Sequence, residues 1–164
     1  VRMQNEAEML RKANSVGVGP RLLRVSKNFL LMQIIDGDLL PQWLDKRVGK
    51  PKVRRAVNEV LEQCWQLDTA GLDHGELCHA PKHIIIDRKD KPFIVDFETA
   101  SVNRRPSNVT SICQFLFISA LVARIVTEKV GRTDVETIVE GLRLYKSNRT
   151  HEKFEKILHC LLHL

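Results

Sequence analysis

Residues 74–98 constrain the fold more than any other stretch of this chain. Two short apolar runs, 84–86 and 93–95, flank a charged turn, and this pattern predicts a β-hairpin. Glu76 precedes the hairpin in the sequence His-Gly-Glu-Leu, and Asp96 follows it in the sequence Asp-Phe-Glu. Each acid emerges from a regular element into a loop, a location that puts a carboxylate at the mouth of a cleft. The sequence therefore predicts one site that uses both acids.

The chain before this stretch begins as a helix followed by two strands. Apolar residues recur at helical spacing over residues 4–14. The sequence Gly-Val-Gly-Pro at 17–20 ends the pattern, because glycine permits positive φ and proline cannot continue a helix. The apolar runs 21–25 and 29–35 predict strands joined by a short polar turn. The sequence Asp-Gly-Asp at 36–38 is expected to break the second strand.

Most of the remaining chain is expected to be helical. The clearest amphipathic helix covers residues 52–70 and leads directly into the loop of Glu76, while a shorter helix is expected at residues 39–47. The most apolar run, 109–126, predicts one buried helix, because the polar residues within it argue against a membrane span. Two further helices are expected, one over residues 134–145 with Val135, Ile138, Val139 and Leu142 on one face, and one capped by Thr150.

Composition indicates one compact unit that contacts polyanions. The chain has 164 residues, a formal net charge of +6 and a pI of about 9.3, which favours contact with nucleotides, RNA or acidic proteins. The densest basic stretch, residues 46–55, leaves RNA open as a partner, although only Trp43 adds a nearby aromatic side chain. The four cysteines form no C-x-x-C pair, which indicates reduced thiols. No secretory signal is seen, so we expect a cytoplasmic protein outside the membrane.

The two acidic loops and the order of the elements resemble a protein kinase. The kinase catalytic loop, H-R-D-L-x-x-x-N, and the metal-binding D-F-G correspond to the loops of Glu76 and Asp96. A helix, a hairpin, a strand ending in Met-Gln-Ile-Ile-Asp-Gly, a short helix and a long helix precede them, as in a kinase from its αC helix onward. The chain is similar to the RIO-like and KEOPS-kinase-like atypical group, in particular to archaeal predicted serine/threonine protein kinases, over residues 1 to about 126.

This resemblance implies an α+β, protein-kinase-like fold. Residues 1–35 would form a partial N-lobe, made of the αC helix and a β-hairpin. Residues 36–164 would form a mostly helical C-lobe, and the two parts one compact unit. The resemblance also implies ATP as the nucleotide, with Mg²⁺ as the cation and Mn²⁺ as an alternative. A protein substrate or protein partner is implied as well.

The resemblance assigns nucleotide-binding roles in the first 35 residues. Glu6 would be the helix glutamate that pairs with a strand lysine at the α and β phosphates. Met32 would stand behind the adenine. The backbone of Gln33, Ile34 and Ile35 would bind the adenine edge.

The catalytic roles fall on the two acidic loops. Glu76 would take the place of the catalytic aspartate, and Asp96 that of the aspartate that binds Mg²⁺. Glutamate keeps the charge but extends its reach by one methylene. Lys82 could neutralise the transferring phosphate, with a solvated surface lysine as the simpler alternative.

Three residues depart from the kinase pattern near the metal. Pro81 stands where kinases have the asparagine that binds the second Mg²⁺, so His83, directly before the apolar strand, is the candidate replacement. Imidazole is a poor ligand for Mg²⁺, which prefers oxygen, but His83 would tolerate Mn²⁺. Glu98 replaces the glycine of D-F-G and is a candidate metal ligand. A zinc site of Cys78, His79 and His83 is the alternative.

The expected function is that of an ATP-dependent serine/threonine protein kinase. No G-x-G-x-x-G loop and no V-A-I-K-like strand precede Glu6, and the start at Val1 inside a helical pattern hints at upstream sequence that contains them. If the chain is complete as given, we expect weak ATP binding and little or no phosphate transfer. A catalytically inactive pseudokinase or interaction scaffold is the first alternative. A small-molecule kinase is the second, because the segment after Asp96 leaves little room for an activation loop.

Overall fold

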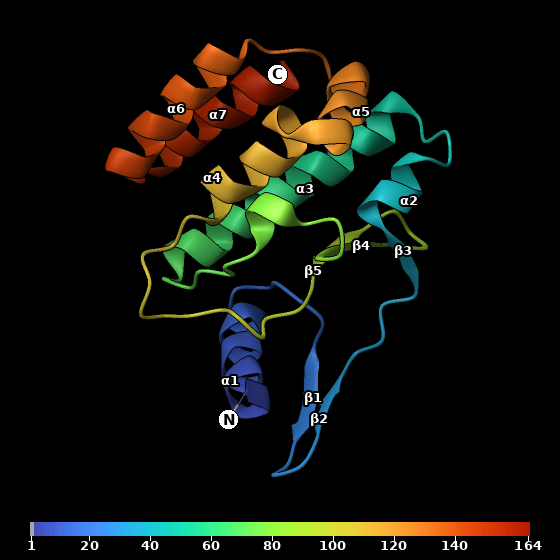
Figure 1. The fold of residues 1–164 in the computed structure, drawn as a ribbon, viewed down its shortest axis with the longest axis vertical. Coiled ribbons are helices and arrows are strands. Elements are labelled where there is room, and N and C mark those ends of the chain that lie inside the picture. Colours follow the sequence, from blue (N-terminus) through green and yellow to red (C-terminus); the bar gives the residue numbers. More distant parts are fainter. Residues whose placement is uncertain (1) are drawn as a thin grey trace.

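The computed structural model describes residues 2–164 and has an α+β fold, which confirms the coarse fold class. The helices are α1 (Arg2–Ser15), α2 (Leu40–Leu44), α3 (Lys50–Thr69), α4 (Asn108–Cys113), α5 (Ala120–Val130), α6 (Val135–Ser147) and α7 (His151–Leu162). The strands are β1 (Leu22–Val25), β2 (Leu30–Met32), β3 (Gly37–Leu39), β4 (Ile84–Asp87) and β5 (Pro92–Ile94). Figure 1 shows α2 to α7 at one end of the molecule and α1 with β1 and β2 at the other.

The N-terminal end consists of α1 and an antiparallel hairpin, as the sequence predicts. Asn14 joins the two, because its Nδ2 donates to the carbonyls of Val18 and Pro20, and its Oδ1 accepts from the backbone N–H of Leu22. The second strand ends at Met32, earlier than the predicted residue 35. Residues 33–36 instead connect the two sheets without regular secondary structure.

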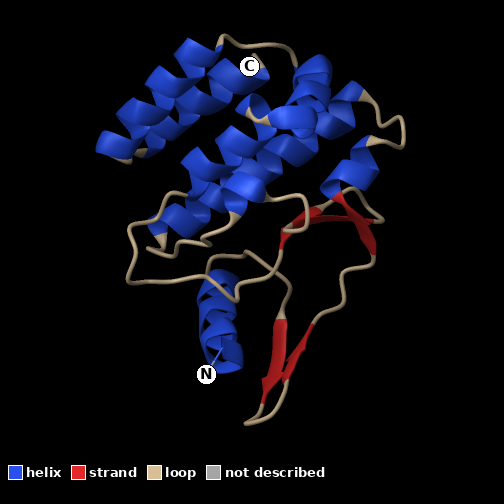
Figure 2. Ribbon diagram, viewed as in Figure 1, coloured by secondary structure: helices blue, strands red, loops and turns tan. Residues whose placement is uncertain are grey.

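A second sheet of three antiparallel strands, in the order β3-β4-β5, lies between the two ends (Figure 2). The β4–β5 hairpin is the one predicted from the two apolar runs. Strand β3 was not predicted, because residues 36–38 read as a strand break. Gly37 explains the difference: a Cβ at this position would lie 1.9 Å from the carbonyl oxygen of Ile86, so only glycine allows the backbones to approach this closely.

The core lies among the helices around α3, which packs against α4, α5, α7 and β5. The buried residues of α3 recur at spacings of three and four, as expected for an amphipathic helix. They are Val53, Ala56, Val57, Val60, Leu61, Cys64, Leu67 and Asp68. A positive φ of 73° at Gly71 follows the end of this helix, which directs the chain into the loop of Glu76.

The apolar run after residue 108 differs from its prediction as one helix. Helix α4 continues into a π-helical turn at Gln114–Ile118, and α5 then leaves in a new direction (Figure 1). Ser119 marks the break: its extended backbone donates to the Gln114 carbonyl, and its hydroxyl accepts from the Gln114 amide. Within residues 2–164, no single helix is both long enough and apolar enough to cross a bilayer.

The last two helices form an antiparallel pair. Asp134 and Thr150 cap α6 and α7 with their side chains, and the cap by Thr150 confirms the prediction. The predicted apolar face of α6 is wrong in part. Val135 and Val139 are exposed, whereas Tyr145 is buried with Ile138 and Leu142. The reason is the hydrogen bond from the Tyr145 hydroxyl to the carboxylate of Asp68 on α3, which turns this face of α6 toward the core.

Candidate metal centre

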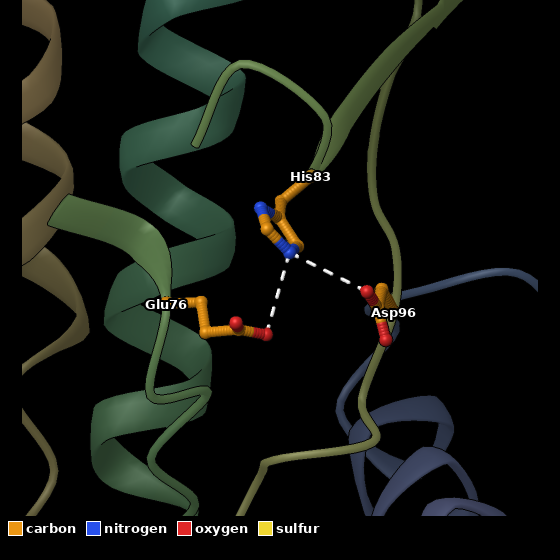
Figure 3. Close-up of side chains that lie close together, drawn as sticks. All are labelled: Glu76, His83 and Asp96. Carbon is orange, nitrogen blue, oxygen red and sulfur yellow. Dashed lines mark ion pairs between the residues drawn. The ribbon is translucent and has the colours of Figure 1, made fainter. Parts of the chain in front are cut away.

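Three side chains converge at the junction between the small sheet and the helices (Figure 3). Nε2 of His83 lies 3.4 Å from Oε2 of Glu76 and 3.4 Å from Oδ2 of Asp96. One ligand atom from each of the three lies within 4.8 Å of the others. In the described part of the chain, residues 2–164, no other group of three His, Cys, Asp or Glu side chains is arranged in this way. The sequence named all three as site residues, and the structure brings them together.

The β4–β5 hairpin places His83 beside Asp96. His83 directly precedes β4, and its carbonyl accepts from the backbone N–H of Val95 at 2.9 Å, which extends the pairing of the hairpin by one step. Asp96 is the next residue, where the chain leaves the sheet. Antiparallel pairing brings the start of β4 and the end of β5 together, and it therefore places His83 beside Asp96.

Asp96 adopts an uncommon backbone conformation. Its φ of 66° is in the left-handed region, which non-glycine residues rarely enter and which costs about 1 kcal/mol or more. Its Oδ1 accepts a long hydrogen bond, 3.4 Å, from the backbone N–H of Glu98. Such strain persists only where the surrounding structure enforces it. Here the turn directs the carboxylate toward His83 while the chain changes direction.

His74 anchors the loop of Glu76. Its backbone N–H donates to Oδ1 of Asn108 at 2.9 Å, and its ring Nε2 donates to the Val95 carbonyl at 2.9 Å. The ring proton is therefore on Nε2 in the neutral form, and Nδ1 is left buried without a partner. Burial lowers the pKa of His74, since a charged ring would need a second acceptor that the site does not offer. A neutral His74 thus connects both acidic loops.

The loop after Asp96 supports Glu76 from the other side. The Thr99 hydroxyl lies 3.1 Å from Oε2 of Glu76 and 3.2 Å from the His74 carbonyl. Arg104 pairs with the buried Asp73 at 2.7 Å and donates to the Thr99 carbonyl at 2.8 Å. These contacts hold the residues before Glu76 and the loop after Asp96 together.

Glycine is required at residue 75, which lies against both Arg104 and Thr99. Its φ is 96°, and a Cβ here would lie 2.6 Å from Nη2 of Arg104 and 3.2 Å from the Thr99 hydroxyl. A side chain at residue 75 would displace the guanidinium that joins the two loops. The glycine of the His-Gly-Glu sequence therefore has a geometric reason in this chain.

Helix α1 adds a further carboxylate, that of Glu6, near this cluster. Burial first, and then the negative charges of Asp96 and Glu98, raise the pKa of Glu6. Asn5 attaches the helix to this region, because its amide donates to the carbonyls of Glu98 and Ala100. The negative charges near Asp96 therefore add to one another, which favours a bound cation.

The three converging side chains can serve as ligands of a divalent cation. For ligand atoms about 2.1 Å from a metal, neighbouring corners of a tetrahedron are about 3.4 Å apart. Both distances from Nε2 of His83 agree with this spacing. The side chain of His83 is 13% exposed, whereas those of Glu76 and Asp96 are 41% and 46% exposed. The cluster is thus fixed on the imidazole side and open on the carboxylate side.

Other predicted metal residues lie elsewhere. The carboxylate of Glu98 pairs with Arg2 of α1 at 3.0 Å and is not one of the three converging side chains. Cys78 is half-buried and His79 exposed, and neither belongs to the cluster around His83. Lys82 is exposed, next to His83 in the chain.

The residues predicted to bind adenine lie at the end of β2 and along the connection between the two sheets. Met32 is half-buried and packs against the core. Gln33, Ile34 and Ile35 line a pocket of about 260 Å³ together with residues 87–89. Ile34 is 89% exposed, so this connection offers both apolar surface and backbone to a ligand.

The basic stretch 46–55 is partly paired with acids. Lys46 contacts Asp38 at 2.6 Å, and Lys52 contacts Asp90 at 2.7 Å. These pairs reduce the positive charge available to a polyanion. RNA binding by this stretch stays a prediction.

Three contributors to the site were not identified from the sequence. They are the Thr99 hydroxyl, the Arg104–Asp73 pair and the Asn108 amide. Thr99 lies close to Asp96 in the chain, so a hydroxyl three residues after the acid was the available signal. Asn108 and Arg104 are remote from Glu76 in sequence, and only the folded chain brings them to the loop.

No family model matches this chain. The chain is similar to an uncharacterized protein of Methanocaldococcus jannaschii, MJ1211, with 29% identity over 117 residues. The match covers 70% of this chain and 98% of that protein.

Proposed function

We propose that this protein is a kinase-like phosphotransferase that uses ATP and a divalent cation to phosphorylate serine or threonine hydroxyls of proteins. The observation that carries the proposal is the convergence of Glu76 and Asp96 on His83, with both acids on loops that border the same hairpin. Phosphoryl transfer depends mainly on positioning and on neutralising charge rather than on covalent chemistry of the protein. A cluster of acids around a half-open volume meets that requirement.

The acids divide these tasks by their surroundings. Asp96, His83 and Oε2 of Glu76 would hold the cation, which when bound neutralises phosphate oxygens. Glu76 keeps Oε1 available while its Oε2 contacts His83 and Thr99, so it can accept the proton of an acceptor hydroxyl. Glu6 of α1 supplies a carboxylate that can pair with a cationic group at the phosphates.

The connection between the sheets supports a nucleotide base. Gln33 continues the β1–β2 pairing, because its N–H donates to the Arg21 carbonyl and its side-chain oxygen accepts from the Arg21 N–H. Within residues 2–164, the backbone of Ile34 makes no hydrogen bond. The free backbone groups of Ile34 beside this pocket can bind the polar edge of a planar base.

The first experiment measures ATP binding to the full chain. Isothermal titration calorimetry with ATP would be performed in MgCl₂, in MnCl₂ and in EDTA. We expect binding only with a cation, and loss of that binding in Asp96→Asn. Asp45→Asn, an exposed aspartate at the end of α2, is the matched control and should bind as the wild type does. Binding that is unchanged by EDTA and by Asp96→Asn would contradict the proposal.

The second experiment separates an enzyme from a scaffold. Transfer of radiolabelled phosphate from ATP to casein would be followed for the wild type and for Glu76→Gln. We expect slow transfer by the wild type and none by the variant, because the variant lacks the carboxylate that accepts the hydroxyl proton. ATP binding without transfer would favour the scaffold alternative.

A further inference from the structure

We infer that the cluster of Glu76, His83 and Asp96 selects a first-row transition-metal cation, Mn²⁺ or Zn²⁺, over Mg²⁺. The inference deepens the proposed function and rests on it for the use of the cation. Binding of the metal itself needs no nucleotide and can be measured alone.

The donor set is the first argument. It combines one imidazole nitrogen with carboxylate oxygens from two different loops. Mg²⁺ demands an octahedron of oxygen atoms and usually keeps several waters, whereas imidazole is a ligand of Zn²⁺ and other first-row transition metals. A nitrogen donor at the inner edge of the site therefore disfavours Mg²⁺ and strengthens the binding of its competitors.

The rigidity of His83 is the second argument. Its side chain is the least exposed of the three and comes from the start of β4, where the hairpin fixes the backbone. The carboxylates are the more exposed partners and can adjust to the ion. The imidazole nitrogen is therefore the fixed donor of the cluster, and the two carboxylates are the adjustable ones.

Glu76 rather than Glu98 completes the ligand set. Glu98 pairs with Arg2, whereas Glu76 lies 3.4 Å from the ring nitrogen of His83. Thr99 contacts the same Glu76 oxygen and so restrains it near the imidazole. The third ligand therefore comes from the loop before the hairpin.

The direct test is pulsed electron paramagnetic resonance of Mn²⁺ added to the wild-type protein without nucleotide. A coordinated imidazole produces nitrogen modulation of the Mn²⁺ echo, and we expect that modulation. Its absence in a sample with bound Mn²⁺ would overturn the inference. This readout uses the native protein and does not depend on the folding of a variant.

A substitution then tests the selectivity. His83→Asn replaces the nitrogen donor with an amide oxygen, and calorimetry with MnCl₂, ZnCl₂ and MgCl₂ would compare the three cations. We expect the preference for Mn²⁺ over Mg²⁺ to fall about tenfold or more. His79→Asn, an exposed histidine of the same loop, is the control and should keep the wild-type preference. An unchanged preference in His83→Asn, in protein with wild-type circular dichroism, would overturn the inference.

The outcomes separate this inference from the proposed function. Equal binding of Mg²⁺ and Mn²⁺, together with cation-dependent ATP binding, would overturn the inference and leave the function standing. Selective Mn²⁺ or Zn²⁺ binding without any ATP binding would support the inference and contradict the function. No binding of any of the three metals would overturn the inference.

Discussion

Two carboxylate centres of this molecule, one around Asp68 and one around Glu76 and Asp96, differ in how their oxygens are used. Asp68 is buried and accepts from the backbone N–H groups of Asn108 and Val109, from the Asn108 amide and from the Tyr145 hydroxyl. Glu76 and Asp96 are half-exposed and share one imidazole nitrogen. The first centre is saturated with donors, while the second retains acceptor capacity.

The comparison shows which acids can bind a ligand. Burial raises the pKa of Asp68, and its hydrogen bonds act in the opposite direction, so the folded structure must supply all its donors. The open centre has too few donors for its oxygens, and water or a cation must complete it. Asn108 connects the two, because its Nδ2 donates to Asp68 and its Oδ1 accepts from the His74 backbone.

The largest expected effect on stability comes from removing the buried carboxylate of Asp68. Asp68→Ala leaves the buried donors of Asn108 and Tyr145 without an acceptor, and we expect a loss of about 3 kcal/mol in the free energy of unfolding. Urea denaturation followed by circular dichroism measures it. Asp45→Ala, at an exposed position, should change it by less than about 0.5 kcal/mol. A similar small change in Asp68→Ala would show that the two centres do not differ as described.

Removing an acid of the half-exposed centre, Glu76 or Asp96, should weaken metal binding and leave the stability of the fold nearly unchanged. In Asp96→Asn we expect Mn²⁺ affinity to fall about 100-fold, because a charged ligand becomes neutral. The free energy of unfolding should stay within about 0.5 kcal/mol, since asparagine tolerates the left-handed backbone as aspartate does. Calorimetry and urea denaturation measure the two quantities. A large loss of stability with intact Mn²⁺ binding would show that Asp96 supports the fold and does not bind the cation.

The pH dependence of stability should reveal the buried histidine between the centres. Burial holds the pKa of His74 below its ordinary value of 6.5. Between the folded pKa and pH 6.5, the unfolded chain therefore binds a proton that the folded protein does not. Stability contributed by neutral His74 is therefore complete above pH 6.5 and is lost as the pH falls through the folded pKa, at up to about 1.4 kcal/mol per pH unit.

Urea denaturation at pH 7.5 and 5.5 measures this loss for the wild type and for His74→Gln. Glutamine does not titrate and can still donate to the Val95 carbonyl. We expect a smaller loss on acidification in His74→Gln than in the wild type and in the exposed control His79→Gln. The same loss in all three proteins would exclude His74 as its source.

The smallest effect on Mn²⁺ affinity is expected from Thr99, whose hydroxyl contacts Glu76. Thr99→Val removes the hydroxyl near Oε2 of Glu76 but keeps the side-chain shape, so we expect Mn²⁺ affinity to fall only a few-fold, equivalent to about 1 kcal/mol. Thr99→Ser, which keeps the hydroxyl, should bind as the wild type does. Glu98→Gln should have no effect on Mn²⁺ affinity, because Glu98 pairs with Arg2. Equal effects of Thr99→Ser and Thr99→Val would remove the hydrogen bond as the cause.

Local sequence patterns determined much of the secondary structure. The spacing of apolar residues defined α1, α3 and α7, and two short apolar runs around a charged turn defined the β4–β5 hairpin. These elements were predictable because the pattern that defines each one involves only residues close together in the sequence. Glu76 and Asp96 were identified because each follows a regular element into a loop and matches an acid of the kinase pattern. His83 was identified because it directly precedes the apolar strand, where that pattern has an asparagine.

Only the tertiary structure decided how the elements and side chains combine. It paired β3 with β4 through the close backbone approach at Gly37, and it broke the long apolar run at Ser119. It also directed Glu98 toward Arg2 and brought Glu76 to His83, a choice that sequence spacing leaves open. The physical reason is that contacts between distant segments depend on backbone direction, and backbone direction is set by packing of the whole chain.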